Sequence, residues 1–368
     1  MGKEVFLLAN ISGLPNEQYW QQRQLLLEKK RFKNTMDLER ELDRIVQREV
    51  MGIENEINDF LVKFEKENQI NYQSAIQELN KKEFAEYKNR IGALIEDFRK
   101  NPTPKTIEQI KVIQARRKVT RLQSLQDYLK IRSCNLSEQE IDLIETHLMN
   151  QYSDEYLENL YTLQSGTNNF SPFDIPSTEA LKAIVNYPYS GDLFSVHVWS
   201  ANEKMVNSLI QTLQTGMVRG HGIDKMARDF RKLLKDQQGV KYDSYSIKRI
   251  LRTESSFIQE KANSDSMKEY GTERFVVIAA EDERMCKRCG AKHETKVKLE
   301  DEQLGINAPP FHPMCRCTKV ADVLNQQEID EINAFIDRRN IEYDEWKEKY
   351  GIKKKSKKRE NHQKKKKK

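Results

Sequence analysis

The N-terminal part of the chain carries a long stripe of apolar side chains at helical spacing. From Leu38 to Phe64 the apolar positions recur every three or four residues, which places them on one face of an α-helix. No proline interrupts the chain between Asn16 and Lys100. The pattern predicts one or two long helices over residues 17–66, and it indicates packing in a helix bundle rather than a binding site.

A pair of prolines marks the end of this segment. Pro102 and Pro104 cannot both lie inside a helix, because proline lacks an amide hydrogen and its ring clashes with the preceding turn. A second helical stretch is expected after them, with its apolar face running from Ile107 to Leu129. The prolines therefore separate two helical regions.

A second helix start and a linker follow. Ser137 and Glu140 have the spacing of a capping box, so we expect a new helix to begin at Ser137 and to run to about Leu163. Residues 165–192 are rich in Ser, Gly, Asn, Pro and Asp, which favours a linker. A short helix is expected within it, around Thr178–Val185.

Helical spacing returns after the linker and is followed by the best strand candidate of the chain. The run from Phe275 to Ala280 is short, apolar and rich in β-branched residues, which is typical of a buried strand. The glycines at 216, 220 and 222 are interpreted as turn residues, since no strand precedes them and no Gly-Lys-Ser/Thr follows. Further helices are expected from Phe194 and over residues 223–234, 245–270 and 325–350.

These elements predict a mainly α protein. Its N-terminal body is built from long helices, and a small α+β C-terminal domain is held together by a knuckle of cysteine and histidine residues. The expected organisation is a helical body at 1–164, a linker at 165–192, the small domain at 193–320, a C-terminal helix at 321–350 and a disordered Lys-rich tail at 351–368.

The charge of the chain is concentrated in this tail. The net charge is +6, but the segment from Lys353 onward contributes +10, so residues 1–352 carry −4. A flexible polycation binds phosphate groups without sequence preference. The candidate nucleic-acid-binding residues are therefore Lys353, Lys354, Lys355, Lys357, Lys358 and Arg359.

Hydropathy and cysteine count limit the class of protein further. The sequence contains no apolar run near the ~18–20 residues of a membrane-spanning helix, so no membrane association is expected. An apolar stretch at Val5–Ala9 is too short for a signal peptide, which indicates synthesis in a reducing cytosol. Five cysteines, an odd number, argue against a disulfide scaffold.

Four of these cysteines form a pattern with one histidine. Cys286-x-x-Cys289 is followed after 22 residues by His312-Pro313-Met314-Cys315-Arg316-Cys317. A Cys-x-x-Cys turn supplies one edge of a tetrahedral zinc site, and His312 with Cys315 supplies the other. Cys317 is a substitute for Cys315, since residues two apart in an extended segment share a face. His293 is the alternative nitrogen ligand. The preferred interpretation is a structural zinc knuckle.

Other chemistries compete with this interpretation. Cys-x-x-Cys also serves thiol exchange, although the surrounding βαβ pattern of that class is missing. A catalytic zinc would need an open coordination position and a nearby carboxylate. Outside the knuckle, Arg252 and Glu254 are the best polar pair; an ion pair that packs a helix under the strand is favoured over a site that activates water.

The same stretch of sequence resembles a known family. Arg252-Thr253-Glu254, Tyr270-Gly271, the short strand, Asp282, Cys286-x-x-Cys289 and the ending Pro309-Pro310-Phe311-His312-Pro313-Met314-Cys315-Arg316-Cys317 are similar to the phage Mu protein F-like head-morphogenesis domain. The similarity covers roughly residues 190–320, and the Pro-Pro-x-His-Pro-x-Cys-Arg-Cys ending is its most specific part.

The resemblance implies a minor head protein of a tailed phage. Such a protein acts in procapsid assembly and in DNA packaging or delivery, in contact with the portal, capsid and scaffold proteins. It would be found in the host cytoplasm during assembly and then inside the virion head. No enzymatic activity is expected. The alternatives are a zinc-stabilised, non-specific nucleic-acid-binding protein of the cell, and a nuclease or transferase that uses Arg252, Glu254 and Asp282.

Overall fold

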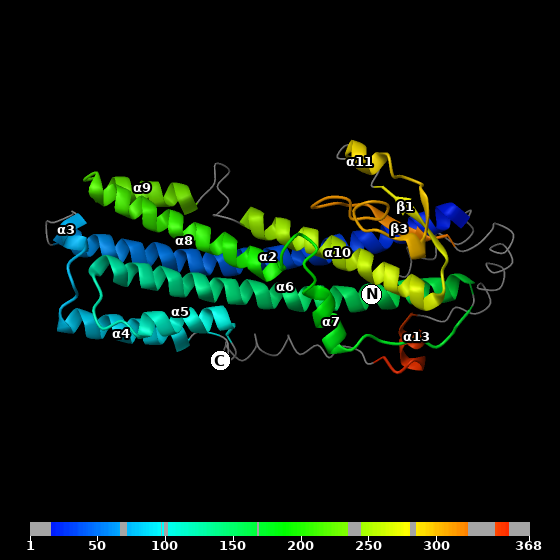
Figure 1. Cartoon of the computed structure of the whole chain (residues 1–368), viewed down its shortest axis with the longest axis horizontal. Coiled ribbons are helices and arrows are strands. Elements are labelled where there is room, and N and C mark those ends of the chain that lie inside the picture. The colour runs from blue at the N-terminus through cyan, green and yellow to red at the C-terminus, as the bar shows by residue number, and fades with distance from the viewer. Residues whose placement is uncertain are drawn as a thin grey trace, which may run out of the picture.

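The structure is a computed structural model that describes residues 16–66, 72–96, 98, 102–167, 169–234, 244–279, 285–322 and 343–352. Long helices lie side by side in an elongated bundle, and a small sheet covers one end of it (Figure 1). The mainly α architecture with a small C-terminal α+β part, predicted from the sequence, is confirmed.

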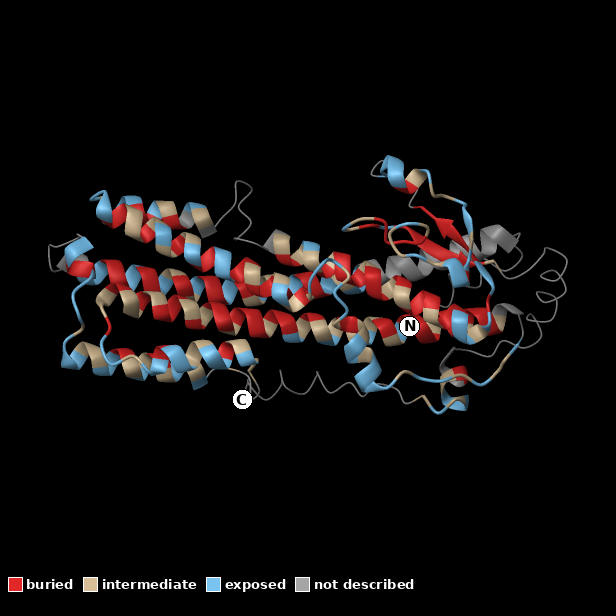
Figure 2. Cartoon of the chain, in the orientation of Figure 1, coloured by how far each residue is buried: buried red, intermediate tan, exposed pale blue. Residues whose placement is uncertain are grey.

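The two longest helices form the axis of the bundle. Helix α2 (Asn16–Lys66) confirms the predicted segment 17–66, and α6 (Arg121–Thr167) runs beside it. The apolar stripe of α2 is buried against α6 and the later helices (Figure 2). The side chains of α2 in this core are Val46, Val50, Ile53, Ile57, Phe60 and Leu61.

Two shorter helices, α4 (Lys81–Glu96) and α5 (Pro104–Gln114), form an outer layer along one side of the bundle (Figure 1). The one-turn helix α3 (Tyr72–Ala75) lies at the C-terminal end of α2. The predicted break at the prolines is confirmed: Pro104 stands in the first turn of α5, and the hydroxyl of Thr103 accepts the Thr106 amide as its N-cap. The expected single stretch from Ile107 to Leu129 is divided, since α5 ends at Gln114 and α6 starts at Arg121.

The predicted helix start at Ser137 is wrong. Ser137 lies inside α6, where its hydroxyl donates to the Ser133 carbonyl at 3.0 Å instead of capping a terminus. The amide of Asn202, on α8, donates to Ser137 at 3.0 Å and to Glu140 at 2.7 Å. A buried polar contact between two helices therefore produced the spacing that resembled a capping box.

The predicted C-terminal helices are present with bounds close to those expected. They are α7 (Thr178–Val185), α8 (Phe194–Val218), α9 (Ile223–Leu234) and α10 (Ser244–Tyr270). Gly220 has φ +65° in the turn between α8 and α9, as expected for a turn glycine. Helix α8 contributes to both of the cores that α2 and α6 form, and α10 contributes to one of them. The division of the chain by a linker at 165–192 stays a prediction.

The small sheet lies across the end of α10. Strand β1 (Arg274–Ile278) pairs antiparallel with β2 (Lys296–Lys298) and with β3 (Thr318–Ala321), in the order β2-β1-β3. The predicted strand is thus the central one. A short helix, α11 (Lys287–Gly290), lies between β1 and β2. A 3₁₀ turn at Leu299–Asp301 follows β2.

A C-terminal helix, α13 (Tyr343–Lys349), packs against the end of α6. Its Trp346 is fully buried, and the indole N–H donates to Gln164 at 3.0 Å. The part of the predicted 325–350 helix before residue 343 lies outside the described residues, as do the predicted Lys-rich tail from Lys353 onward and Asp282. Within the described chain, no helix is long and apolar enough to cross a membrane.

Candidate metal centre

The first half of the candidate centre is the turn that opens α11. Cys286 is the N-cap of this helix, and its Sγ accepts the backbone N–H of Cys289 at 3.4 Å. Cys286 is exposed and Cys289 is buried. The two-residue spacing therefore brings both sulfurs to one side of a tight turn, with one sulfur facing solvent and the other facing the sheet.

The second half is the turn that precedes β3. The Cys315 amide donates to the His312 carbonyl at 3.1 Å, and Met314 between them has φ +59°. Cys315 and Cys317 are buried, and Thr318 directly after them is the first residue of β3. The pairing of β3 with β1 thus fixes the segment that carries both cysteines.

These two turns meet in space, as the sequence predicted. His312 Nε2 lies 3.5 Å from Cys286 Sγ and 3.2 Å from Cys289 Sγ. The Sγ atoms of Cys289 and Cys315 are 3.9 Å apart. Tetrahedral zinc with bonds of about 2.3 Å to sulfur and 2.0 Å to nitrogen requires ligand separations of roughly 3.5–3.8 Å. The thiol and imidazole donors therefore fit a metal ion, and this Cys/His cluster could hold one.

The donor atoms form two overlapping groups that share Cys289. One contains Cys286, Cys289 and His312, and the other contains Cys289, Cys315 and Cys317, with separations of at most 4.8 Å inside each group. Both Cys315 and Cys317 thus stay candidates for the fourth ligand. His293, the alternative nitrogen ligand, is in neither group; its Nδ1 accepts the Ala279 amide at 3.2 Å and supports the sheet.

The surroundings favour the thiolate at two of the cysteines. The backbone N–H of Cys289 lowers the pKa of Cys286 to about 7. A hydrogen bond with Cys317 lowers the pKa of Cys315 to about 5, whereas the same hydrogen bond raises the pKa of Cys317. Burial raises the pKa of Cys289 to about 12. Metal ligation requires deprotonated sulfur, so the first metal–sulfur bonds are expected to form at Cys286 and Cys315.

Helix α10 holds the second turn in place through two hydroxyl groups to which the sequence analysis assigned no role. The Ser256 hydroxyl donates to the Cys315 carbonyl at 2.7 Å, and the Thr253 hydroxyl accepts the Met314 amide at 3.3 Å. Thr253 and Ser256 lie one turn apart, so they face the knuckle together. Neither has a signal in a single sequence, since a hydroxyl in a helix usually bonds to its own backbone.

Arg252 and Glu254 have separate partners on the two sides of this helix. The Arg252 guanidinium binds Glu39 of α2 with two hydrogen bonds, of 2.5 and 2.9 Å, whereas Glu254 accepts the Ser190 hydroxyl at 2.7 Å. Arg252 thus forms an ion pair with Glu39 of α2 and not with Glu254, so the predicted ion pair between Arg252 and Glu254 is wrong. The two side chains do not converge on a common pocket, which removes the geometric basis for a shared catalytic role.

Glu254 gives a pH-dependent prediction. Burial raises its pKa above the ordinary carboxyl value, while the Ser190 hydrogen bond opposes the shift. A raised folded-state pKa contributes stability that is present below the unfolded-state pKa and is lost as pH rises through the folded-state value. The free energy of unfolding of the Glu254→Gln variant, relative to that of the native chain, should therefore increase as the pH rises from 4 to 8. Urea unfolding across this range measures the difference, and a constant difference would contradict the prediction.

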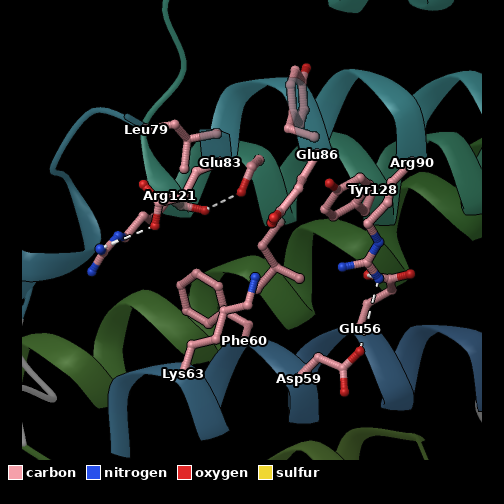
Figure 3. Close-up of a pocket in the computed structure, with 13 residues that line it drawn as sticks. Glu56, Asp59, Phe60, Lys63, Leu79, Glu83, Glu86, Arg90, Arg121 and Tyr128 are labelled. Atoms are coloured by element: carbon pink, nitrogen blue, oxygen red, sulfur yellow. Dashed lines mark hydrogen bonds and ion pairs between the residues drawn. The ribbon is translucent and has the colours of Figure 1, made fainter. Parts of the chain in front are cut away.

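A separate pocket lies at the opposite end of the bundle, between α2, α4 and α6 (Figure 3). Both arginines that line it are paired: Arg90 binds Glu56 at 2.5 Å, and Arg121 lies 3.2 Å from Glu83. The Arg90 guanidinium also covers the Tyr128 ring. These pairs tie α4 to α2 and α6, so the pocket is interpreted as part of the packing of the outer layer.

Comparison with known proteins gives one match. Residues 207–320 match the family described as phage Mu protein F like protein. No curated protein and no solved structure matches the chain. The family match contains the whole candidate metal centre and confirms the resemblance predicted from the sequence. It supports a general role in phage head morphogenesis, and hence a place in the virion head.

Proposed function

We propose, from the phage Mu protein F-like domain at residues 207–320, that this chain is a minor head protein that joins the procapsid at the portal and assists DNA packaging or delivery. The observation that carries the proposal is the coincidence of this family match with the Cys/His cluster. The role is structural rather than catalytic, with the portal, capsid and scaffold proteins as partners.

Zinc is the proposed metal of the knuckle, because thiolate and imidazole donors in tetrahedral separation are the ligands of structural zinc sites. The domain around it has a small core, in which three of the four knuckle cysteines are themselves buried members. The free energy of metal binding would supply the stability that this core lacks. The rigid domain would then act as a docking unit in the assembling head.

The proposed DNA contact is the Lys-rich tail, which lies outside the described residues. Its support is the +10 charge of the segment from Lys353 to Lys368. A polycation of this kind binds duplex DNA with an affinity that falls steeply with salt. The tail would act on packaged or entering DNA, while the helical body contacts protein partners.

The proposal is tested by co-expression of the chain with the portal, scaffold and major capsid proteins of its phage. Quantitative mass spectrometry of purified procapsids should find a low and constant number of copies per particle. This number should fall to background when the portal gene is omitted. A chain that is absent from procapsids, or equally abundant without the portal, would contradict portal association; absence would favour the cellular nucleic-acid-binding alternative.

A further inference from the structure

The folded body has one strongly basic region, which its overall charge conceals. Residues 72–120 contain eleven basic and six acidic side chains, a net charge of +5. Residues 1–352 together carry −4, so the rest of the body carries −9. The region that contains the outer-layer helices α4 and α5 is thus opposite in net charge to the rest of the body.

Hydrogen bonds bring the start of α4 beside the end of α5 and the turn that follows it. The Leu79 amide donates to the Val119 carbonyl at 2.9 Å, so the start of α4 lies beside the turn between α5 and α6. The Lys88 ammonium donates to the Gln114 carbonyl at 2.7 Å and joins α4 to the end of α5. We call the exposed cations around this junction the basic surface; they are Lys81, Lys82, Lys111, Arg117 and Lys118.

Most cations of the basic surface have no ion-pair partner among the described residues. Lys118 lies 3.1 Å from Glu78, an exposed pair of small energetic value. Among the described residues, the other four have no carboxylate within ion-pair distance. The neighbouring Arg116 is different, because it pairs with the buried Asp127 at 3.4 Å. Arg116 is therefore paired with a carboxylate inside the fold, whereas the cations of the basic surface are exposed to solvent.

We propose that the basic surface binds the phosphate backbone of duplex DNA without sequence preference, as a second contact distinct from the tail. Clustered exposed cations bind DNA through the release of condensed counterions. Four of the five cations are lysines, which protein–protein interfaces disfavour, so a polyphosphate fits this surface better than an acidic protein. This inference rests on the proposed function, because the phage head is where the DNA would be met. The placement of the cations in the fold does not depend on that function.

The test uses the full-length chain and two triple variants of equal charge. Lys82→Gln, Lys111→Gln and Arg117→Gln neutralise the basic surface. Lys204→Gln, Arg228→Gln and Lys232→Gln are the matched control, at exposed positions of α8 and α9 on the opposite side of the bundle (Figure 1). Each is made with the native tail and with a neutral tail, in which Lys353, Lys354, Lys355, Lys357, Lys358, Arg359 and Lys364 to Lys367 are changed to Gln, so that Lys368 balances Glu360.

Fluorescence anisotropy with a random duplex of about 30 base pairs gives the slope of log K against log salt concentration. Each lost phosphate contact lowers the magnitude of this slope by about 0.9. In both tail backgrounds, the slope of the basic-surface variant should therefore fall in magnitude by roughly 2 to 3. The slope measured for the control variant should change by less than about 0.5. Exposed substitutions of this kind leave folding nearly unchanged, and circular dichroism checks this.

The outcomes separate the two proposals. If the basic-surface variant has the same slope as the control in the neutral-tail background, the basic surface does not bind DNA and the inference is overturned. A drop in slope caused by the neutral tail alone supports only the tail contact. Incorporation into procapsids tests the proposed function independently, because it does not depend on either DNA measurement.

Discussion

Replacing Cys289 by serine is expected to abolish metal binding and to unfold the small sheet, while the long-helix bundle stays folded. Cys289 is the donor shared by both groups of the cluster, and it is buried in the core of the small domain. Structural zinc contributes about 10–16 kcal/mol of apparent binding free energy in zinc-finger peptides. A domain whose core is partly made of its own metal ligands cannot replace this contribution by packing.

The measurement combines zinc content per chain with hydrogen exchange. We expect about one zinc in the native reduced protein and none in Cys289→Ser, with amide protection lost in β1 and β3 but kept in α2 and α6. Cys134→Ser is the matched control, because Cys134 is equally buried but lies in α6, within the bundle core. It should keep its zinc. Full zinc content in Cys289→Ser would exclude this cluster as the metal site.

The same assay identifies the fourth ligand. Cys315 and Cys317 are both buried, and both lie within reach of Cys289. Serine at the position that ligates the metal should lower zinc affinity at least tenfold, whereas serine at the other position should leave it nearly unchanged.

Local sequence patterns were sufficient to predict the position of most of the described helices. The stripe on α2 predicted its bounds because a helix that packs along its whole length must repeat apolar residues every three to four positions. The bounds of α7 and α10 were set by proline, glycine and serine at their ends. The meeting of the two cysteine turns was predicted for a chemical reason, since a metal needs four donors and each turn offers two.

Contacts between distant segments were not predictable in this way. Strands β2 and β3 have only three and four residues, and they exist because β1 pairs with both. Thr253 and Ser256 support the knuckle across some sixty residues of sequence. The spacing at Ser137 predicted a cap, but a contact with Asn202 on another helix uses that hydroxyl. In each case the partner is remote in the chain, so no local pattern reveals it.

Lys319 is expected to be the most sensitive position of the sheet outside the cysteines. Its side chain is fully buried on β3; the ammonium donates to the Ser264 hydroxyl at 2.6 Å, contacts Glu302 and lies 3.7 Å from Glu260. Removal of one partner from a buried ion cluster leaves uncompensated charge and typically costs about 3–5 kcal/mol. Lys319→Ala should therefore lower the free energy of unfolding of the sheet by this amount.

The loss should extend to the metal centre, because β3 begins directly after Cys317 and its pairing with β1 fixes the turn that carries Cys315. Zinc affinity is thus expected to fall together with stability. Lys296→Ala, which removes an exposed lysine of β2 paired with Asp322, should cost less than about 1 kcal/mol and leave zinc affinity unchanged. Urea unfolding and competition with a zinc chelator measure both quantities.

A rescue variant tests whether uncompensated charge and lost side-chain volume together account for this cost. Changing Lys319 to Met together with Glu260→Gln and Glu302→Gln removes the ammonium and both carboxylates but keeps their approximate volumes. Since replacement of a buried ion cluster by neutral groups is often tolerated, the triple variant should recover more than half of the stability that Lys319→Ala loses. If it unfolds as readily as Lys319→Ala, neither uncompensated charge nor lost volume explains the cost. The sheet and the knuckle would then depend on the ion pairs and the hydrogen bond that the Lys319 ammonium itself makes.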